Sequence, residues 1–277
     1  MDWESAIQQI VNSVPTDDET YQGEDGLAYC ARCHTPRQSR IELFGQVRIV
    51  PCLCRCMAEQ RDKDEQEWQA HQRALKLKRI REAGFPEREM QFWTFENDDG
   101  KNPRYTNATK AYVEDFEEFR REGKGLFLYG NVGTGKSFFA ACVVNALIDR
   151  GYRCMMTNFS RLINEISGLW EGKQAYINSL SRLDLIAIDD LGVERDTEYM
   201  NEAVTTIIDS LYRSKVPMII TSNYTPRQLT ADDNEFRRKR AYDRLLERCL
   251  PVEVNGDSRR KQIGRNDYAE FKKRLGL

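Results

Sequence analysis

Three apolar runs in the second half of the chain have the length and the flanks of buried strands. They are GLFLYG at residues 125–130, LDLIAIDDLG at residues 183–192 and VPMIITSNYTP at residues 216–226. The first run is followed by SFFAACVVNALIDRG, residues 137–151, in which apolar residues recur at helical spacing. Buried strands that alternate with helices predict an α/β fold, in which a parallel sheet is flanked by helices.

The first half of the chain has a different pattern. The segment RIELFGQVRIV, residues 40–50, predicts a β-hairpin that turns near Gly45. It is followed by residues 58–84, which contain no proline and no internal glycine and mix both charges. This segment predicts a long surface or linker helix that ends at Gly84. We therefore expect an N-terminal domain with the linker helix at residues 1–75 and a larger domain at residues 76–277.

A glycine-rich loop links the first predicted strand to its helix. The sequence GNVGTGKS matches G-x-x-x-x-G-K-[ST] without a gap. Such a loop directs backbone N–H groups and the positive end of a helix dipole at a di- or triphosphate. Lys136 is predicted to reach the β- and γ-phosphates of ATP, and Ser137 to bind Mg²⁺. The predicted nucleotide-binding residues of the loop are Gly130, Asn131, Val132, Gly133, Thr134, Gly135, Lys136 and Ser137.

Polar side chains end the other two predicted strands. Asp189 and Asp190 follow one apolar run, and Asn223 follows the next. Open parallel sheets bind their ligands at the carboxyl ends of the strands. We predict that Asp189 completes the Mg²⁺ shell, that Asp190 acts as a general base on the attacking water, and that Asn223 orients this water against the γ-phosphate. The alternatives are a helix-capping acid pair and a turn asparagine.

Five of the eight cysteines lie in the first sixty residues, as a C-x-x-C pair and a later group of three. Clustered cysteines in a cytoplasmic chain are more often metal ligands than disulfides, and a hairpin this small needs a metal to hold it together. We expect Cys52, Cys54 and Cys56 to lie on an extended segment, where alternate residues face the same way, so geometry does not separate the three as ligands. His34 is a further candidate ligand, and a redox pair of cysteines is the alternative to a metal site. We favour a structural Zn²⁺ site formed by Cys30, Cys33, Cys54 and Cys56.

Composition and charge narrow the class. A chain of 277 residues with 40% hydrophobic and 31% charged residues is typical of a soluble globular protein. It contains no apolar run of eighteen residues and no signal-peptide pattern, so we expect a cytoplasmic protein without a membrane partner. Residues 1–29 carry seven acids and no Lys or Arg, whereas residues 235–277 carry thirteen basic and seven acidic residues. The two ends therefore suit different partners, and the basic end faces nucleic acid, nucleotide phosphates or only solvent.

Taken together, the motifs resemble the AAA+ helicase loaders of the DnaC and DnaI type, especially the phage-borne members. GNVGTGKS, LIAIDDLG and IITSN stand in the order of that family, and AGFPEREMQFWTFEND resembles its entry to the ATPase domain. RRKRAYDRLLERC resembles the arginine-finger box, and GDSRRKQ resembles the sensor-two segment. The cysteine-rich front end is similar to the zinc-binding domain through which such loaders contact the helicase. The resemblance implies an AAA+ P-loop ATPase domain preceded by a small zinc-binding domain and a linker helix.

The resemblance also implies roles for three arginines. Arg240 would be the arginine finger, with Arg244 beside it, and Arg260 would be the sensor-two arginine that contacts the nucleotide. The other arginines of the box at residues 237–244 are alternatives for the finger. Asp190 departs from the pattern, because many members of the wider ATPase class carry Glu at this position. A shorter side chain there implies slow hydrolysis, which suits a switch better than a motor.

A mechanism follows from the resemblance. ATP, with Mg²⁺, would bind between neighbouring subunits of a self-associated loader, and the ATP state would hold single-stranded DNA. The N-terminal domain, with its Zn²⁺, would hold the replicative hexameric DNA helicase until hydrolysis releases the loader. Phe159, Trp170, Lys173 and Tyr176 are candidates to stack bases or meet phosphates, although ordinary helix packing fits any one of them better.

Two other functions compete with helicase loading. An IstB-like transposition ATPase would share the ATPase core and also act on DNA, but the cysteine module argues against it. A DNA-binding adaptor with a vestigial ATPase is the second alternative. The intact Lys136, Ser137 and Asp189 argue against an inactive site.

Overall fold

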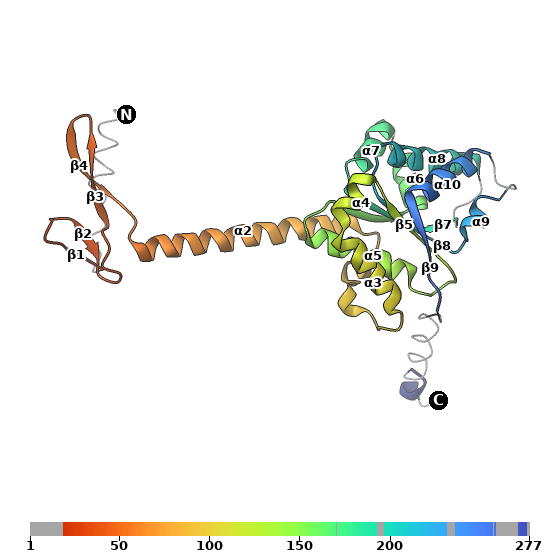
Figure 1. Cartoon of the computed structure of the whole chain (residues 1–277), viewed down its shortest axis with the longest axis horizontal. Helices are drawn as coiled ribbons and strands as arrows, with labels where there is room; N and C mark the ends of the chain where they lie inside the picture. The colour runs from red at the N-terminus through yellow and green to blue at the C-terminus, as the bar shows by residue number, and fades with distance from the viewer. Residues whose placement is uncertain are drawn as a thin grey trace. The chain divides into compact units, whose positions relative to one another are not determined.

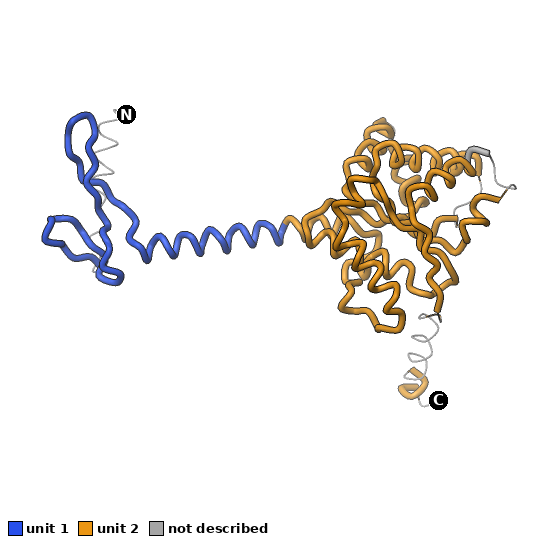
Figure 2. The backbone as a smooth tube through the Cα atoms, viewed as in Figure 1, with its two compact units in different colours: residues 1–75 blue, residues 76–277 orange. Residues whose placement is uncertain are grey.

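Two units make up the chain, Met1–Leu75 and Lys76–Leu277, and each is described by itself (Figure 2). The computed structural model describes residues 19–169, 171–192, 197–231, 236–256, 258 and 271–275. For Phe236 and Arg237 it describes the backbone alone. Among the described residues, no helix combines the length and the apolar character needed to cross a bilayer.

A parallel sheet of five strands forms the centre of the larger unit (Figure 1). In spatial order the strands are β6 (Cys154–Asn158), β7 (Leu185–Leu191), β8 (Met218–Ser222), β5 (Gly125–Tyr129) and β9 (Cys249–Glu253). All neighbouring pairs are parallel. The three strands predicted from apolar runs are β5, β7 and β8, and they occupy the centre of the sheet. The predicted α/β class is therefore confirmed.

Helices cover both faces of this sheet (Figure 1). One apolar core includes residues of α6 (Phe159–Gly168), α7 (Lys173–Leu180), α8 (Glu198–Arg213), α9 (Pro226–Leu229) and α10 (Phe236–Arg248). The opposite core includes residues of α3 (Pro103–Glu114), α4 (Phe116–Glu122) and α5 (Lys136–Asp149), with the short 3-10 helix η1 (Arg88–Phe92). A second 3-10 helix, η2 (Phe95–Asn97), lies between η1 and α3.

The central strand β5 shows how the sequence builds both cores. Phe127 faces one core, while Leu126 and Leu128 face the other, because successive side chains of a strand alternate between the two faces. Phe127 is fully buried, and burying such a side chain stabilises the fold by about 1.5–3 kcal/mol. A strand that is buried on both faces is therefore apolar throughout, as the run GLFLY shows.

The described residues of the smaller unit form two separate two-stranded sheets. β1 (Thr20–Gln22) pairs with β2 (Ala28–Cys30), and β3 (Gln38–Leu43) pairs with β4 (Gln46–Pro51). The second pair is the predicted hairpin, and it turns through Phe44 and Gly45, whose φ angles are 52° and 74°. Two left-handed residues are typical of the tight turns that suit twisted strands.

The predicted linker helix is also confirmed, as α2 (Arg55–Gly84), which begins before the predicted start at Ala58. Its side chains are exposed along most of its length, as its mixed charges predict. Among the described apolar residues of the smaller unit, only Leu27, Cys30 and Cys54 are buried. Three such residues do not form a hydrophobic core, so the described part of the unit needs another source of stability.

Candidate functional site

The glycine-rich loop lies between the carboxyl end of β5 and the first turn of α5. Gly130, Gly133 and Gly135 have φ angles of 139°, 85° and 98°. Side chains rarely adopt these conformations, and at Gly130 a Cβ atom would also lie 2.6 Å from the carbonyl oxygen of Val254. The hydroxyl of Thr134 donates to the carbonyl of Asn131 (3.0 Å), which closes the turn of the loop. The eight residues expected to cradle phosphate thus lie in this loop and the first turn of α5, at the end of the sheet, with Val132 exposed at the surface.

Lys136 lies at the centre of this loop. Its Nζ donates to the carbonyl oxygens of Gly130 (2.9 Å) and Asn131 (2.8 Å) and to Oδ1 of Asn223 (3.0 Å). The residue is only 5% exposed. The structure therefore brings the predicted phosphate-binding lysine and the predicted water-orienting asparagine into direct contact, although they are far apart in the sequence.

Asp189 lies at the carboxyl end of β7 and faces the start of α5. Burial raises the pKa of its carboxyl above the ordinary value, while hydrogen bonds from Thr221 and Ser137 and the positive charge of Lys136 oppose this rise. The hydrogen bond to Ser137 joins the two residues expected to bind Mg²⁺. A carboxylate beside a hydroxyl is a ligand set that suits this hard cation.

Asp190 is presented by a bulge in β7. The register between β7 and β8 shifts between Ile188 and Leu191, so Asp189 and Asp190 lie opposite one residue of β8. Asp190 has a φ of 54°, which is uncommon for a residue other than glycine, and its side chain is exposed. Bulges next to active sites redirect side chains, and this one separates the directions of two consecutive acids.

Thr221 is a site residue that sequence reasoning missed. Its buried hydroxyl donates to Oδ1 of Asp189 and accepts from the backbone N–H of Asp190 (2.9 Å). The next residue, Ser222, is also buried and donates to the carbonyl of Leu191 (2.7 Å). These two hydroxyls of β8 hold the bulge of β7 in place. The sequence feature that could have indicated this role is the pair of hydroxyl residues that ends the apolar strand directly before Asn223.

We expect Thr221→Val to lower the rate of ATP hydrolysis by about tenfold to a hundredfold, with little change in nucleotide binding. Valine keeps the shape of threonine but loses both hydrogen bonds, which is worth about 1–3 kcal/mol. Phosphate release at saturating ATP measures the rate, and Thr221→Ser is the matched control that should retain most of it. A Thr221→Val protein with the wild-type rate would show that the bulge positions both acids without this hydroxyl.

Two arginines of the predicted finger box are engaged within the unit. Arg244 pairs with Asp209 of α8, which raises its pKa, and its guanidinium lies 5.5 Å from the ring centroid of Tyr212. Nε of Arg238 donates to the hydroxyl of Tyr242 (2.7 Å). The contact of Arg244 holds α10 against α8, and that of Arg238 joins two residues of α10. Both side chains therefore have structural roles.

Arg240 lies on the same helix and is exposed. Within the described part of the chain, no ion pair of its guanidinium is found. The side chain of Arg237 and the whole of Arg260, the predicted sensor-two arginine, lie outside the described residues. Of the box arginines whose side chains are described, Arg240 is thus the one most able to reach another molecule.

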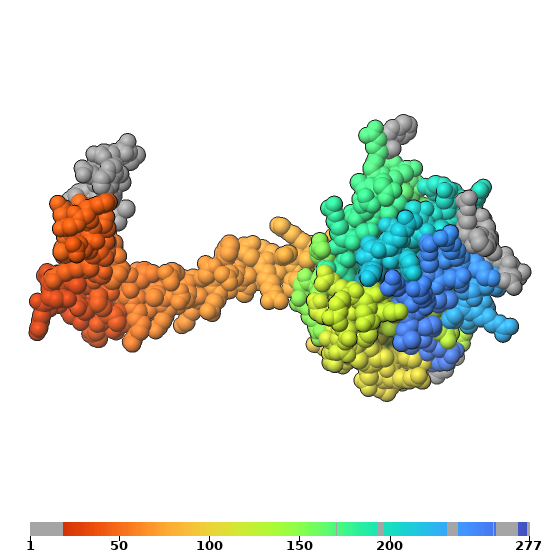
Figure 3. Space-filling view, turned by 45° about the horizontal axis from the view of Figure 1, so that its top comes forward, coloured from red at the N-terminus to blue at the C-terminus, as the bar shows by residue number. Residues whose placement is uncertain are grey.

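Three of the candidates for DNA contact, Phe159, Lys173 and Tyr176, lie on α6 and α7, the green segment at the surface of the unit in Figure 3. Phe159 is fully buried in the core and does not stack bases. The hydroxyl of Tyr176 donates to Glu165, and burial together with this bond raises its pKa. Both residues therefore pack the helices, as the alternative expected. Lys173 is exposed, and Trp170 lies outside the described residues.

Four cysteines of the smaller unit converge on one point. The Sγ atoms of Cys30, Cys33, Cys54 and Cys56 all lie within 4.8 Å of one another. Sγ of Cys56 is 3.6 Å from Sγ of Cys30 and 3.3 Å from Sγ of Cys54. Four sulfurs in a tetrahedron around zinc are about 3.8 Å apart, because a Zn–S bond is about 2.3 Å long. The cluster therefore fits a zinc site with four cysteine ligands.

The thiols of this cluster differ in their affinity for protons. The Thr35 hydroxyl lowers the pKa of Cys33 to about 5, whereas the neighbouring Cys54 raises the pKa of Cys56 to about 12. Binding of a divalent cation would hold all four as thiolates.

The two other candidate ligands lie elsewhere. Sγ of Cys52 donates to the carbonyl of Pro36 (3.4 Å), and burial raises its pKa. Nδ1 of His34 is 3.3 Å from the hydroxyl of Tyr21. The expectation of an extended segment through Cys56 is wrong, because α2 begins at Arg55. Cys54 and Cys56 therefore flank a helix start, and the rule of alternate residues does not apply to them.

Comparison with known proteins places the larger unit and the linker helix in a family. Residues 59–266 match the model of the IstB-like ATP binding protein. The chain is 26% identical over 181 residues to the replicative helicase loader DnaI of Bacillus subtilis (strain 168), covering 60% of this chain and 58% of that protein. It is also 26% identical over 201 residues to the replicative helicase loader DnaC of Escherichia coli (strain K12), covering 71% of this chain and 80% of that protein.

Solved structures agree on the fold. A crystal structure of the DnaC helicase loader superposes with a TM-score of 0.54 at 21% identity, covering 61% of this chain and all of that one. A crystal structure of DnaI gives a TM-score of 0.51 at 22% identity, covering 65% of this chain and 99% of that one. The match to the family model extends over most of the chain, which therefore belongs to the IstB-like ATP-binding protein family and has the fold of a P-loop ATPase.

Proposed function

We propose that this chain is an ATP-dependent loader, which binds the replicative hexameric DNA helicase in the cytoplasm and places it on single-stranded DNA during replication initiation. The observation that carries the proposal is the joint presence of a complete phosphate site and a separate cysteine unit. Residues 59–266 match the family model, so Cys30, Cys33, Cys54 and Cys56 lie outside it. A module added to a shared ATPase core suits a dedicated partner, and the curated relatives are named as replicative helicase loaders.

The loop and the strand ends supply the parts of an ATP hydrolase. The backbone of the loop and Lys136 bind the phosphates, while Ser137 and Asp189 would hold Mg²⁺, which neutralises charge on the phosphate oxygens. Asp190 polarises the attacking water, and Asn223 orients it. In the free loop Asn223 accepts a hydrogen bond from Lys136, so phosphate binding to Lys136 releases the amide for this task.

An aspartate in place of the more common glutamate makes hydrolysis slow. Arg240 of a neighbouring subunit supplies the positive charge that completes the site, so hydrolysis requires self-association through ATP-bridged interfaces. ATP is then hydrolysed only in assembled loaders. The loader keeps the helicase until ATP at the interface between subunits is hydrolysed. Sensor-two Arg260 is assigned to the nucleotide by family resemblance.

The cysteine unit would bind one structural Zn²⁺. Its strands are short, its described apolar residues are mostly exposed, and a metal held by four sulfurs would stabilise this described part in place of a core. Binding of the metal is then equivalent to folding of the unit. A folded unit carrying an exposed hairpin provides the surface to which the helicase binds.

A reconstituted loading reaction tests the function. The purified chain is mixed with each of a panel of bacterial replicative helicases and with circular single-stranded DNA, and DNA-bound helicase is measured with and without ATP. We expect one helicase to require the chain for loading. If instead the chain stimulates strand transfer by a transposase and loads no helicase, the transposition alternative is correct.

The double variant Cys30→Ser and Cys33→Ser extends the same reaction. We expect near-stoichiometric zinc in the wild type and none in the variant, together with loss of helicase binding. ATP binding should survive, because the phosphate loop belongs to the other unit. Cys52→Ser is the matched control and should keep its zinc, since its sulfur lies outside the cluster. Full zinc content in the double variant would refute the site.

A further inference from the structure

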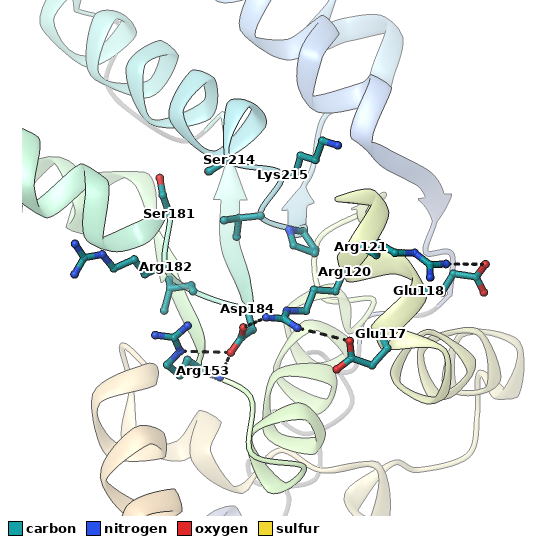
Figure 4. Close-up of a pocket in the computed structure, with 13 residues that line it drawn as sticks. Glu117, Glu118, Arg120, Arg121, Arg153, Ser181, Arg182, Asp184, Ser214 and Lys215 are labelled. Carbon is teal, nitrogen blue, oxygen red and sulfur yellow. Dashed lines mark hydrogen bonds and ion pairs between the residues drawn. The ribbon is translucent and has the colours of Figure 1, made fainter.

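The edge of the sheet opposite the phosphate loop carries a polar groove (Figure 4). It lies at the amino ends of β6, β7 and β8 and has a volume of about 880 Å³. Side chains from α4, from the turns before β6 and β7, and from the turn after α8 line it. Its basic lining residues are Arg120, Arg121, Arg153, Arg182 and Lys215.

Three acids in the groove offset part of this charge. Asp184 pairs with Arg120 (2.7 Å) and Arg153 (3.5 Å), and Glu117 also lies near Arg120 (3.6 Å). Glu118 lies 3.8 Å from Arg121. The remaining two cations, Arg182 and Lys215, are exposed and have no ion pair with any described residue. The groove therefore keeps an excess of positive charge.

Asp184 gives the groove a fixed wall. Its side chain is only 10% exposed, and Arg120 and Arg153 approach it from opposite sides (Figure 4). Its carboxylate also accepts from the backbone N–H of Arg153 (2.8 Å), while its own N–H donates to the carbonyl of Arg153 (2.9 Å). Two guanidinium groups are thus positioned before any ligand arrives, which reduces the entropy that binding would cost.

Hydroxyl groups extend the groove to a second hollow. Ser181 and Ser214 line both hollows, and Ser210, Asn178 and Arg213 line the second. Arg and Lys side chains, together with serine hydroxyls and amides, are the groups that proteins use to contact phosphate and sugar. The residues lining either hollow include no aromatic side chain, so no platform on which bases could stack is present.

We propose that this groove binds the phosphodiester backbone of DNA, at a site separate from the nucleotide edge of the sheet. The proposal rests on the proposed function, in which the chain meets DNA. The phosphates of DNA would supply negatively charged partners for Arg182 and Lys215. Because the groove would make no contacts to bases, binding there would not depend on the DNA sequence. DNA held in this groove would stay close to the ATPase unit without occupying the end of the sheet that carries the phosphate loop.

The double variant Arg182→Gln and Lys215→Gln tests the groove. Binding of labelled single-stranded and double-stranded oligonucleotides is measured by anisotropy as a function of salt. We expect affinity to fall about tenfold at about 0.1 M salt, and the slope of log K against log salt to decrease by about 1.4 for single strands or about 1.8 for duplex. The two arms identify which form of DNA the groove holds.

The control variant Lys76→Gln and Arg88→Gln also removes one lysine and one arginine, but at exposed positions outside the groove. It should leave the slope close to that of the wild type. Melting and basal ATP hydrolysis of the groove variant should be unchanged, because both side chains are exposed and lie at the opposite edge of the sheet from Lys136.

Three outcomes would overturn the proposal. A groove variant that binds DNA like the control, in a wild type that binds DNA, rejects the groove alone. Loss of helicase binding with intact DNA binding shows that the groove is a protein interface. A wild type that binds no DNA rejects the DNA step of the proposed function, and the groove proposal with it.

Discussion

Lys136→Ala is expected to abolish productive binding of ATP, with an affinity loss of at least about a hundredfold. The ammonium group is nearly buried at the centre of the loop, where it makes three hydrogen bonds to neutral oxygens. Phosphate oxygens would replace these partners in charge-assisted bonds, each worth about 1.5–3 kcal/mol. Binding of a labelled nucleotide measures the loss. If the variant bound ATP with unchanged affinity, Lys136 would not be a phosphate-binding residue.

Asp190→Asn is the complementary change, because it should preserve binding and remove hydrolysis. The carboxylate would act on the water and not on the bound phosphates, so its loss affects the transition state alone. Asparagine tolerates the left-handed backbone of this position, so the bulge should persist. Phosphate release is measured together with nucleotide binding. Hydrolysis at the parental rate would show that a residue other than Asp190 activates the attacking water.

The left-handed backbone at Asp190 also bears on the choice of aspartate. Glutamate lacks the short side chain that lets Asp and Asn adopt positive φ readily. The bulge that separates Asp189 from Asp190 thus favours the shorter acid, at the expense of reach toward the water. The slow hydrolysis that we propose would then follow from the local backbone conformation.

The central strands and the phosphate loop were predictable because their physical requirements are local. Phe127 and its neighbours are buried on both faces, which demands a continuous apolar run. The glycines of the loop need positive φ angles, and the hairpin turn at Gly45 does as well. By contrast, β9 was not predicted, because it is an edge strand in which Leu250 is 66% exposed and Pro251 interrupts the pattern.

Features that depend on distant partners were not predictable. The role of Thr221 requires the register between β7 and β8, which no local pattern encodes. The sequence favoured Cys54 and Cys56 over Cys52 without a geometric reason, and that reason depends on where α2 begins. The groove around Asp184 was missed for the same reason, since its arginines come from three separate segments of the chain.

The arginine box shows the same limit and how the structure narrows it. The sequence left several arginines equivalent, because RRKRAYDR contains four of them in eight residues. The partner of Arg244, Asp209, lies on another helix, and the contact assigns that arginine to packing. Arg238 is assigned to Tyr242 in the same way. Among the box side chains that the structure describes, these assignments favour Arg240 as the proposed finger.

Arg240→Ala is therefore expected to bind ATP almost normally but to hydrolyse it about a thousandfold more slowly or worse, which is the usual effect of losing an arginine finger. An exposed side chain on α10 contributes nothing to the fold that alanine would not, so stability should be unchanged. Arg244→Ala is the contrasting variant. It leaves the half-buried Asp209 with only the more distant Arg213 (3.7 Å) as an ion-pair partner, and it should lower the melting temperature instead.

Mixing two inactive variants decides whether Arg240 acts on a neighbour. Lys136→Ala protein keeps its arginine and Arg240→Ala protein keeps its phosphate loop, so a mixed interface joins one intact loop to one intact finger. Partial recovery of hydrolysis is expected in the presence of helicase and single-stranded DNA, where the chains associate. A finger acting within its own subunit gives no recovery, because each chain would still lack one part of its site. A mixture no more active than its components would thus reject the trans assignment, even if Arg240→Ala alone were inactive.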